Sequence, residues 1–452
     1  MTDPTGTERV DVAVVGGGVS GLAAAHRLAH RGHSVLVLER EPDLGGRIKT
    51  IEVAEHHLDL GAQFVTDFYA NFLELARSLG LRDRLVRRSQ TAYVVRDGVE
   101  HAVWPIKHFR RTAGVSRHGK LRMLRLLPSM LAHWTALDVA NLTKCAHLDV
   151  TSADRYLRRT VGEEDAKFFF RPILSGLLYW EAETTSYSVV LAVLKAFAGN
   201  GGTYRMPCGL RDFTDRLGAA ARVRTGATVE AVARSSDSGY DVTYTHAGAS
   251  CAISARSVLY AVPATEVSGL LPRHGGVDRA FFERVSYSRT AILTYQLSGD
   301  PVGYPRGAIL FPKPDVPDIA SVNPLYDYVD GPAGAGRDRQ PLVNVCLSDD
   351  GFASHHALDD DELSAVVIQR LATAAPDQRW TADAKLVHVQ RWPLALPRFD
   401  VGHVRAVSAF LSALPPTSTV DFCGDYLGGP YLDGAITSGL RAADRLSRAL
   451  GG

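Results

Sequence analysis

The stretch RVDVAVVGGGVSG, residues 9–21, decides the fold of this chain. Its first seven residues are β-branched and mostly apolar, which predicts a buried parallel strand. Glycines follow at once, and residues 22–28, LAAAHRL, continue in strong helix formers. Residues 34–38, SVLVL, predict a second buried strand that leads directly to Glu39. A strand, a glycine turn, a helix and a second strand in this order predict a β-α-β unit.

The glycines of this unit have separate tasks if it binds a dinucleotide. Gly16 allows the tight turn, Gly18 lets the backbone approach a pyrophosphate, and Gly21 lets the helix pack closely on the strand. The positive end of the helix dipole and the free N–H groups of the first turn would then face the phosphates. Glu39 stands where an acid accepts hydrogen bonds from adenosine ribose hydroxyls, and its charge disfavours the 2′-phosphate of NADP.

A second glycine pair follows Glu39 in LGGR, residues 44–47. Two glycines let the chain pass close to a ligand, and the arginine suits a phosphate or a flavin-side contact. Alone, this stretch would be an ordinary turn with a surface arginine. In the order glycine motif, acid and GGR, however, the sequence resembles the FAD-dependent amine oxidase superfamily. The residues that match the motif are Gly16, Gly18, Gly21, Glu39, Gly46 and Arg47.

Two further segments resemble the same family. DLGAQF, residues 59–64, is similar to the segment that approaches the flavin, and VDFCGD, residues 420–425, is similar to a strand that ends in a Gly-Asp corner. YLDGAITSG, residues 431–439, opens a helix whose N–H groups would face the negative charge of a reduced flavin. The resemblance implies contacts to the ribityl-pyrophosphate from Gly424 and Asp425, and to the isoalloxazine from Gly434 and Ala435.

The resemblance as a whole implies a set of cofactor-binding residues and one residue of the substrate slot. Tyr431 matches the position of an aromatic wall over the flavin, and it is the candidate for the catalytic site. No metal ligand is expected. The cofactor-binding candidates are Gly16, Gly18, Val19, Ser20, Gly21, Glu39, Arg40, Gly45, Gly46, Arg47, Gly61, Ala62, Gln63, Phe64, Val229, Gly424, Asp425, Asp433, Gly434 and Ala435.

Some features of amine oxidases are missing from the sequence. Residues 394–397, LALP, occupy the region of the second aromatic wall, and residues 289–295, RTAILTY, lack the lysine that many family members carry near flavin N5. No cysteine stands in a flavin-linking context, which predicts non-covalent FAD. MPCGL, residues 206–210, and RWPLALP, residues 391–397, agree better with the protoporphyrinogen oxidase and phytoene desaturase branch. That branch implies a bulky, largely apolar substrate.

Composition sets the class of protein. The chain has 452 residues, of which 46% are hydrophobic and 22% charged, so it can bury a large core. A formal net charge of +1 gives no reason to expect a nucleic-acid partner. Five scattered cysteines without a CxxC pair predict neither a disulfide framework nor a zinc site, and they favour a cytoplasmic location. Without a signal peptide or an apolar run of about 18 residues, we expect a soluble protein, at most attached to a membrane surface.

One segment, residues 105–134, is basic and leucine-rich. From His101 to Leu137 no acidic residue occurs, while seven lysines and arginines do. A solvated helical face explains such a pattern, and peripheral contact with an anionic bilayer is the second interpretation.

The order of patterns along the chain predicts an α/β fold with two interleaved domains. A Rossmann-like, glutathione-reductase-like FAD-binding domain, with a parallel sheet and a β-meander, would comprise residues 1–91, 205–270 and 400–452. An α+β substrate domain, with a helical part and an antiparallel sheet, would comprise residues 92–204 and 271–399.

Individual elements are predicted as follows. From residue 92 to 200 the pattern is mainly helical, with helices over 121–134, 152–160 and 163–178. The adjacent Tyr179 and Trp180 are interpreted as core residues, with a substrate contact as the second interpretation. The meander strands are expected over 227–233, 240–244 and 251–254, with a separate strand over 257–263. Further strands are expected over 290–297, 342–347 and 385–392.

Three functional hypotheses remain open at this stage. The first is an FAD-dependent oxidase or dehydrogenase that transfers hydride from a bulky, largely apolar metabolite to flavin N5. The second is a flavin amine oxidase acting on a C–N bond, and the third is a non-catalytic carrier like the Rab escort and GDP-dissociation proteins. No second dinucleotide motif indicates a nicotinamide site, so oxygen or another acceptor is expected to reoxidise the flavin.

Overall fold

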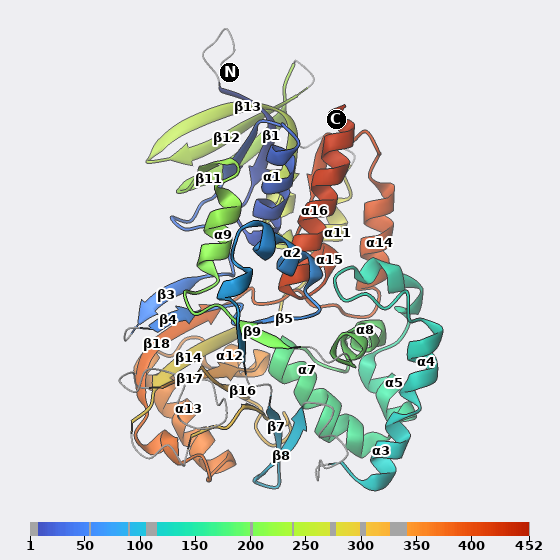
Figure 1. Cartoon of the computed structure of the whole chain (residues 1–452), viewed down its shortest axis with the longest axis vertical. Helices are drawn as coiled ribbons and strands as arrows, with labels where there is room; N and C mark the ends of the chain where they lie inside the picture. Colours follow the sequence, from blue (N-terminus) through green and yellow to red (C-terminus); the bar gives the residue numbers. More distant parts are fainter. Residues whose placement is uncertain are drawn as a thin grey trace.

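The computed structural model describes residues 8–53, 56–88, 91–104, 115–198, 202–236, 239–271, 277–298, 304–325 and 341–451. Two large sheets lie one above the other in Figure 1, and a group of helices stands beside the lower sheet. Both chain ends lie at the upper end of the molecule.

The first sheet is built from segments that are far apart in sequence. Its strand order is β10-β2-β1-β13-β12-β11, and β19 pairs with β13. The pairs β10–β2, β2–β1, β1–β13 and β13–β19 are parallel, whereas β11, β12 and β13 form an antiparallel meander. The strands are β1 (Glu8–Val15), β2 (Val35–Leu38), β10 (Arg222–Arg224), β11 (Ala227–Arg234), β12 (Tyr240–His246), β13 (Ala249–Tyr260) and β19 (Val420–Phe422).

Both faces of the first sheet are covered, because the side chains of β1 alternate between two cores. Val12 and Val14 pack under helices α1 (Val19–His30) and α16 (Leu432–Ala449), and Ala13 and Val15 pack on the opposite face. The helices near the first face also include α2 (Ala70–Ser78) and α9 (Arg211–Gly218), and those near the second are α10 (Ala264–Leu270), α11 (Arg279–Glu283), α14 (His403–Ala413) and α15 (Asp425–Gly428).

The second sheet has the order β18-β14-β17-β16-β15-β7-β8 and is antiparallel except for the pair β15–β7. Helix α13 (Asp360–Ala374) packs on it through an apolar core. Its strands are β7 (Ala92–Arg96), β8 (Val99–Trp104), β14 (Thr290–Gln296), β15 (Ala308–Leu310), β16 (Ile319–Pro324), β17 (Leu342–Leu347) and β18 (Lys385–Trp392), with α12 (Asp349–His355) and η6 (Arg379–Ala382) beside them.

The helical group has its own apolar core. It contains α3 (Arg117–Met123), α4 (Leu126–Ala132), η3 (Leu142–Leu148), α5 (Ala153–Thr160), α6 (Glu163–Asp165), η4 (Ala166–Phe170), α7 (Arg171–Leu178) and α8 (Tyr187–Ala198). Short elements connect the parts: the hairpin β3 (Thr50–Val53) and β4 (His56–Asp59), the turn η1 (Arg82–Arg84), and a small sheet of β5 (Val65–Thr66), β9 (Thr203–Arg205) and β6 (Val86–Arg88).

Three expectations about elements are wrong in detail. The region 92–200 is not helical from its start, because β7 and β8 form an edge hairpin of the second sheet. The helix expected over 121–134 is two helices, α3 and α4, which meet at Leu124 and Arg125. The strands expected over 251–254 and 257–263 are one strand, β13, because it pairs with β12 along its first half and with β1 from Ile253 to Tyr260 without a break between the two partners.

Within the part of the chain that the structure describes, every helix is too short or too polar to cross a membrane.

Candidate cofactor and active site

A cavity of about 980 Å³ lies between the two sheets. One end is formed by the loop after β1, the start of α1 and the end of β2. The other end is formed by α7, α8 and the strands β14, β16, β17 and β18. The C-terminal segment from residue 424 to 435 lines the middle. The volume and the lining by both sheets allow one extended ligand and a second, smaller molecule beside it.

The beginning of α1 opens into the cavity without any side chain in the way. Gly18 is the N-cap, no side chain caps the helix, and a Cβ at Gly18 would meet no protein atom within 4 Å. Gly16 has a φ of +107°, which the tight turn requires and which favours glycine. A Cβ at Gly21 would lie 2.3 Å from the Gly16 oxygen and 2.8 Å from Cβ of Ala261, so this glycine packs the helix on the sheet and does not line the cavity.

The second glycine pair lies directly on the first loop. Gly45 donates its N–H to the Gly17 carbonyl at 2.9 Å, and the backbones of Gly18 and Gly45 form a parallel bridge. Gly45 has a φ of +110°, and a Cβ there would lie 2.3 Å from the Ile48 oxygen. Two backbone loops without side chains therefore form adjacent parts of the cavity wall.

Glu39 is buried at the end of β2 and lines the cavity beside Arg40. Its Oε2 accepts a hydrogen bond from the N–H of Gly17 at 2.6 Å, and its Oε1 accepts one from Glu41 at 2.8 Å. Each carboxylate oxygen can accept a second hydrogen bond, so hydroxyl donors in the cavity can still bind here. The carboxylate thus fixes the glycine loop and leaves acceptor capacity toward a ligand.

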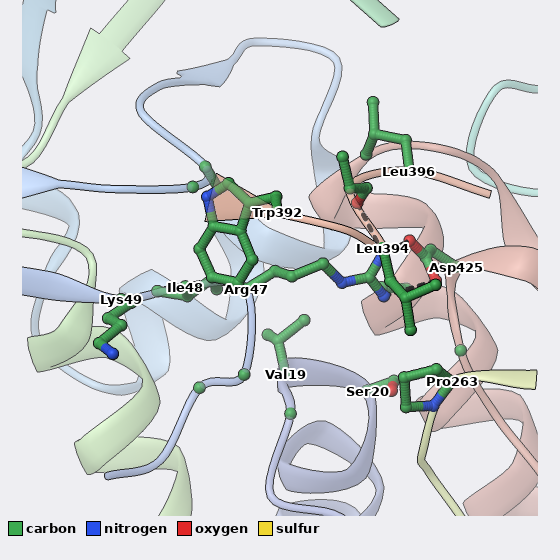
Figure 2. A pocket seen from close by; sticks show the side chains of 18 of the residues that line it. Val19, Ser20, Arg47, Ile48, Lys49, Pro263, Trp392, Leu394, Leu396 and Asp425 are labelled. Atoms are coloured by element: carbon green, nitrogen blue, oxygen red, sulfur yellow. Dashed lines mark hydrogen bonds and ion pairs between the residues drawn. The ribbon is translucent and has the colours of Figure 1, made fainter. Parts of the chain in front are cut away.

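Arg47 joins the N-terminal and C-terminal parts of the site. Its two terminal nitrogens donate to both oxygens of Asp425, at 2.7 Å and 2.9 Å, and one of them also donates to the Ala395 carbonyl at 2.9 Å. Figure 2 shows the side chain extending across the cavity to Asp425. Burial alone would lower the pKa of the guanidinium, but the charge of Asp425 and the nearby Tyr287 raise it above its ordinary value. Arg47 is therefore a permanent charge whose hydrogen bonds are directed to protein groups.

The segment from Gly61 to Phe64 lines the cavity next to Trp392. The Trp392 indole N–H donates to the Leu60 carbonyl at 2.8 Å, and a Cβ at Gly61 would lie 1.9 Å from the Arg47 oxygen. Trp392 belongs to a family-like sequence motif, which by itself predicts no role for the indole. The indole position is defined by a hydrogen bond to a residue distant in sequence, which no local pattern indicates.

Tyr431 lines the cavity as the N-cap residue of α16. Its ring lies 6.0 Å from that of Phe68 and 6.1 Å from that of Tyr69, measured between centroids. Burial raises the pKa of its phenol, and the hydroxyl has no hydrogen-bond partner among the described residues. A buried, unpartnered hydroxyl at a cavity wall indicates a place where a ligand contributes a polar group. No side chain caps α16, so its first N–H groups are also open.

Asp433 and Gly434 follow Tyr431 but do not line the cavity. Asp433 turns toward α2, where its Oδ1 accepts from the N–H of Phe72 at 2.7 Å. A Cβ at Gly434 would lie 2.6 Å from the Gly429 oxygen, so this glycine packs against α15 and the turn after it. Ala435, one residue further, lies at the cavity wall. Successive residues of a helix point in different directions, so only one of these three neighbours in α16 lies at the cavity.

The far wall holds a polar group for which the sequence offered one candidate, Tyr179, as a substrate contact second to a role in the core. Tyr179 lines the cavity together with Thr290, Asn323 and Cys346, for which the sequence predicted no role. Tyr179 has a φ of +56°, which non-glycine residues rarely adopt. Burial and the neighbouring Cys346 raise the pKa of its phenol. Trp180, the next residue, is in the core as expected.

The positions of the other predicted residues can now be stated together. Of the cofactor-binding candidates, all line the cavity except Gly21, Asp433 and Gly434, and those that do are Gly16, Gly18, Val19, Ser20, Glu39, Arg40, Gly45, Gly46, Arg47, Gly61, Ala62, Gln63, Phe64, Val229, Gly424, Asp425 and Ala435.

These residues fit an extended dinucleotide. The uncapped N-terminus of α1 and the bare glycine at its start suit a pyrophosphate, and the carboxylate of Glu39 suits a ribose. The open N-terminus of α16 suits the electron-rich edge of a ring system. Fold and site together are those of a dinucleotide-binding oxidoreductase.

Comparison with known proteins gives the family. Residues 19–447 match the family described as flavin containing amine oxidoreductase, and the chain belongs to this family. It is an FAD-dependent oxidoreductase.

Individual relatives are distant. Chloroplastic protoporphyrinogen oxidase of Nicotiana tabacum is 22% identical over 94% of this chain and 82% of its own length. The crystal structure of a putative protoporphyrinogen oxidase from Exiguobacterium sp. 255-15 has a TM-score of 0.76 at 19% identity, with both chains covered completely. A putrescine oxidase structure with bound putrescine has a TM-score of 0.73 at 20% identity and covers 97% of this chain and 99% of that one. At these identities the structures show the shared fold.

Proposed function

We propose that this oxidoreductase transfers hydride from a C–H bond of a bulky, largely apolar small molecule to flavin N5, in desaturation-type chemistry. The observation that carries the proposal is the composition of the cavity near the second sheet. Apolar side chains from several elements line it there, in the same cavity as Tyr431: Leu177, Leu178, Phe197, Ile292, Leu394 and Leu396. Figure 2 shows Leu394 and Leu396 near Arg47 and Asp425.

The predicted residues that line the cavity would hold FAD. We assign the pyrophosphate to Gly18 and the first turn of α1, and the adenosine ribose to Glu39. The first turn of α16, with Ala435, would lie at the pyrimidine edge of the ring. The cysteines of the chain are all free, and three of them, Cys145, Cys346 and Cys423, are buried. We propose non-covalent binding.

Bound FAD supplies the hydride acceptor, and the protein supplies position and a dry environment. The chain's own part is to hold one C–H bond close to the ring and to exclude water. Tyr431 and the leucines of residues 394 and 396 would form the apolar walls of this slot. Hydride transfer does not require a paired acid and base, and we assign no such pair.

Oxygen or another acceptor would reoxidise the flavin. The chain has one glycine motif of the dinucleotide type, and we assign this motif to FAD. NADH alone should therefore leave the flavin absorbance unchanged under anaerobic conditions. Rapid bleaching by NADH would contradict this part of the proposal.

The strand composition of the two sheets supports a division of the chain into two domains. We propose that residues 1–91, 205–270 and 400–452 form the FAD-binding domain and that residues 92–204 and 271–399 form the substrate domain. The first sheet draws its strands from the first set and the second sheet from the other.

Oxidation of an amine at a C–N bond is the second candidate, and the similarity to putrescine oxidase favours it. The electrostatics of the cavity oppose it for a diamine. Four of the described carboxylates that line the cavity are at its first-sheet side, where the proposed FAD would cover them, and the fifth, Asp425 in the middle, is neutralised by Arg47: the four are Glu39, Glu41, Asp43 and Glu266. The second-sheet side offers hydroxyl, amide and thiol groups, none of which carries a negative charge for an ammonium group at neutral pH.

Anaerobic flavin bleaching against a substrate panel tests the proposal. Polyenes and tetrapyrrole precursors should bleach the bound flavin, and simple mono- and diamines should not. Release of hydrogen peroxide in air gives an independent reading of the same panel. Bleaching by amines alone would establish the second candidate in place of the first.

A further inference from the structure

Helices α3 and α4 expose an apolar stripe at the outer edge of the helical group. Figure 1 shows both helices at this edge, far from the first sheet. The side chains are between 45% and 67% exposed and follow one another at intervals of three or four residues, which places them on one side of a helical path. They are Leu121, Leu124, Leu127, Leu131 and Trp134, and we call them the α3–α4 face. Only two other large apolar side chains of the described residues, Val99 and Val150, are exposed to this degree.

The opposite side of the same helices is firmly attached. Arg122 donates to Asp165 at 2.9 Å and to the Val161 carbonyl at 2.6 Å. Leu126 and Met130 are buried in the core of the helical group. The α3–α4 face therefore cannot turn inward without breaking these contacts, and its exposure is a fixed property of the fold.

The charges around the α3–α4 face are positive. Arg117 and Arg125 are exposed and have no ion-pair partner among the described residues. The three carboxylates of the neighbouring α6 are all neutralised: Glu163 pairs with Arg158, Glu164 with Arg96 and Asp165 with Arg122. An apolar stripe with uncompensated cations next to it complements an apolar interior beneath an anionic surface.

Trp134 adds a feature of the same kind at the end of the stripe. The ammonium group of Lys195 lies 4.9 Å from the centre of its ring and donates to the carbonyls of Trp134 and Leu137. An exposed indole next to a lysine is a combination typical of the boundary between lipid headgroups and acyl chains.

We propose that the α3–α4 face docks on the surface of an anionic lipid bilayer, with both helices lying in the plane of the headgroups. The leucines would enter the outer part of the acyl region, and Arg117 and Arg125 would remain among the phosphates. A second copy of the chain is a poorer occupant, because two such faces would bring like charges together. The inference does not depend on which substrate the cavity takes.

Flotation of the FAD-loaded protein with vesicles tests the proposal. Vesicles of phosphatidylcholine mixed with phosphatidylglycerol have an anionic surface and should carry the protein upward, whereas vesicles of phosphatidylcholine alone should carry much less. Binding should weaken as salt is added. The double variant Leu124→Gln/Leu131→Gln should bind roughly tenfold or more weakly, because two apolar anchors are lost. Trp134 fluorescence should shift to the blue on binding, and this shift should be absent from Trp134→Phe.

The matched control is Val86→Gln/Val401→Gln, which replaces two exposed apolar residues outside the α3–α4 face. It should bind vesicles like the unaltered protein, and both double variants should keep the flavin spectrum and the unfolding temperature. Failure of the unaltered protein to float with anionic vesicles overturns the proposal, as does equal binding by Leu124→Gln/Leu131→Gln. A protein that self-associates, ignores vesicles and becomes monomeric in that variant would show that a second copy occupies the face.

Discussion

Gly18 and Gly21 lie three residues apart at the start of α1 and have opposite surroundings. Gly18 has a φ of −69°, which any residue adopts, and its missing side chain leaves open space. We expect Gly18→Ala to change the free energy of unfolding of the FAD-free protein by less than about 1 kcal/mol. The same methyl group would occupy the proposed pyrophosphate position, so FAD affinity should fall at least about tenfold. Titration of flavin fluorescence measures the affinity, and urea unfolding measures the stability.

Gly21→Ala is the matched variant for this experiment. Its methyl group would collide with the backbone of Gly16, so we expect a loss of about 1–3 kcal/mol in the free energy of unfolding. Equal losses of FAD affinity and equal stabilities in the two variants would contradict the separate roles of these glycines.

The ion pair of Arg47 and Asp425 supports a second prediction at this scale. Asp425 is buried, so Arg47→Ala leaves a carboxylate without its partner and should cost roughly 2–4 kcal/mol of folding free energy. The surface pair of Arg84 and Asp212 provides the control, and Arg84→Ala should cost less than about 1 kcal/mol. Urea unfolding of the FAD-free proteins makes the comparison. When Asp425 is already replaced in Asp425→Asn, Arg47→Ala should lower the free energy of unfolding by clearly less than it does in the unaltered protein. An equal loss in both proteins would refute the pairing.

Single residues also show which contacts could be predicted from the sequence and which could not. The glycine loop and Glu39 could be predicted because their pattern is local, with a strand, a turn and a helix next to one another. Arg47 was predicted to face a phosphate or a flavin, whereas its hydrogen bonds go to Asp425 and Ala395. These partners are hundreds of residues away, and no spacing rule connects them.

At the scale of elements, α2 and α16 depend on each other through one carboxylate. The residue before α2 is Tyr69, whose side chain does not cap the helix, and Asp433 in the first turn of α16 accepts from Phe72 instead. Helix α2 thus receives from another helix the cap that its own sequence lacks.

Burial raises the pKa of Asp433 to about 6, which gives stability a pH dependence. Because the folded protein holds this proton more tightly than the unfolded chain, the stabilisation is complete below the unfolded pKa near 4 and is lost as pH rises through 6. Between pH 5 and pH 7 the free energy of unfolding should lose about 1 kcal/mol from this group. Asp433→Asn should remove that part of the pH dependence, measured by urea unfolding at both pH values. If the free energies of unfolding of the two proteins differ by the same amount at both pH values, Asp433 is not the cause of this pH dependence.

Elements with strong periodicity could be predicted, and weak ones could not. The strands β7 and β8 are short, and they gain their structure as the edge of a sheet whose other strands come later in the chain. The break between α3 and α4 has a local cause, because Pro128 has no N–H to donate to the carbonyl of Leu124, and the run of leucines around it hides this interruption in the apolar pattern.

At the scale of the whole molecule, FAD would touch segments from both ends of the chain. We therefore expect the unfolding temperature to rise with FAD concentration, with a gain of about 2.7 kcal/mol at a free concentration 100 times the dissociation constant. Thermal unfolding monitored by far-ultraviolet circular dichroism at several FAD concentrations measures this. A curve that is independent of FAD would contradict cofactor binding to the folded state, and Gly18→Ala should shift the dependence to higher concentrations.

The interleaved arrangement could be proposed from the sequence because strand-rich segments recur at the beginning, middle and end. The small sheet of β5, β9 and β6 could not. Its strands have two or three residues each, and they pair only because the two large parts of the molecule bring Val65–Thr66 next to Thr203–Arg205.

The placement of β13 has a consequence for how the chain is made. Strand β1 needs β13 as its neighbour, and β13 in turn receives β19 from near the end of the chain. During synthesis, β1 and β2 leave the ribosome long before either partner exists, with their edges unpaired and their apolar faces open to water. The nascent polypeptide thus has to be shielded from other chains until translation is almost finished, and a message that ends before codon 420 would yield a product that lacks part of its central sheet and cannot retain the flavin.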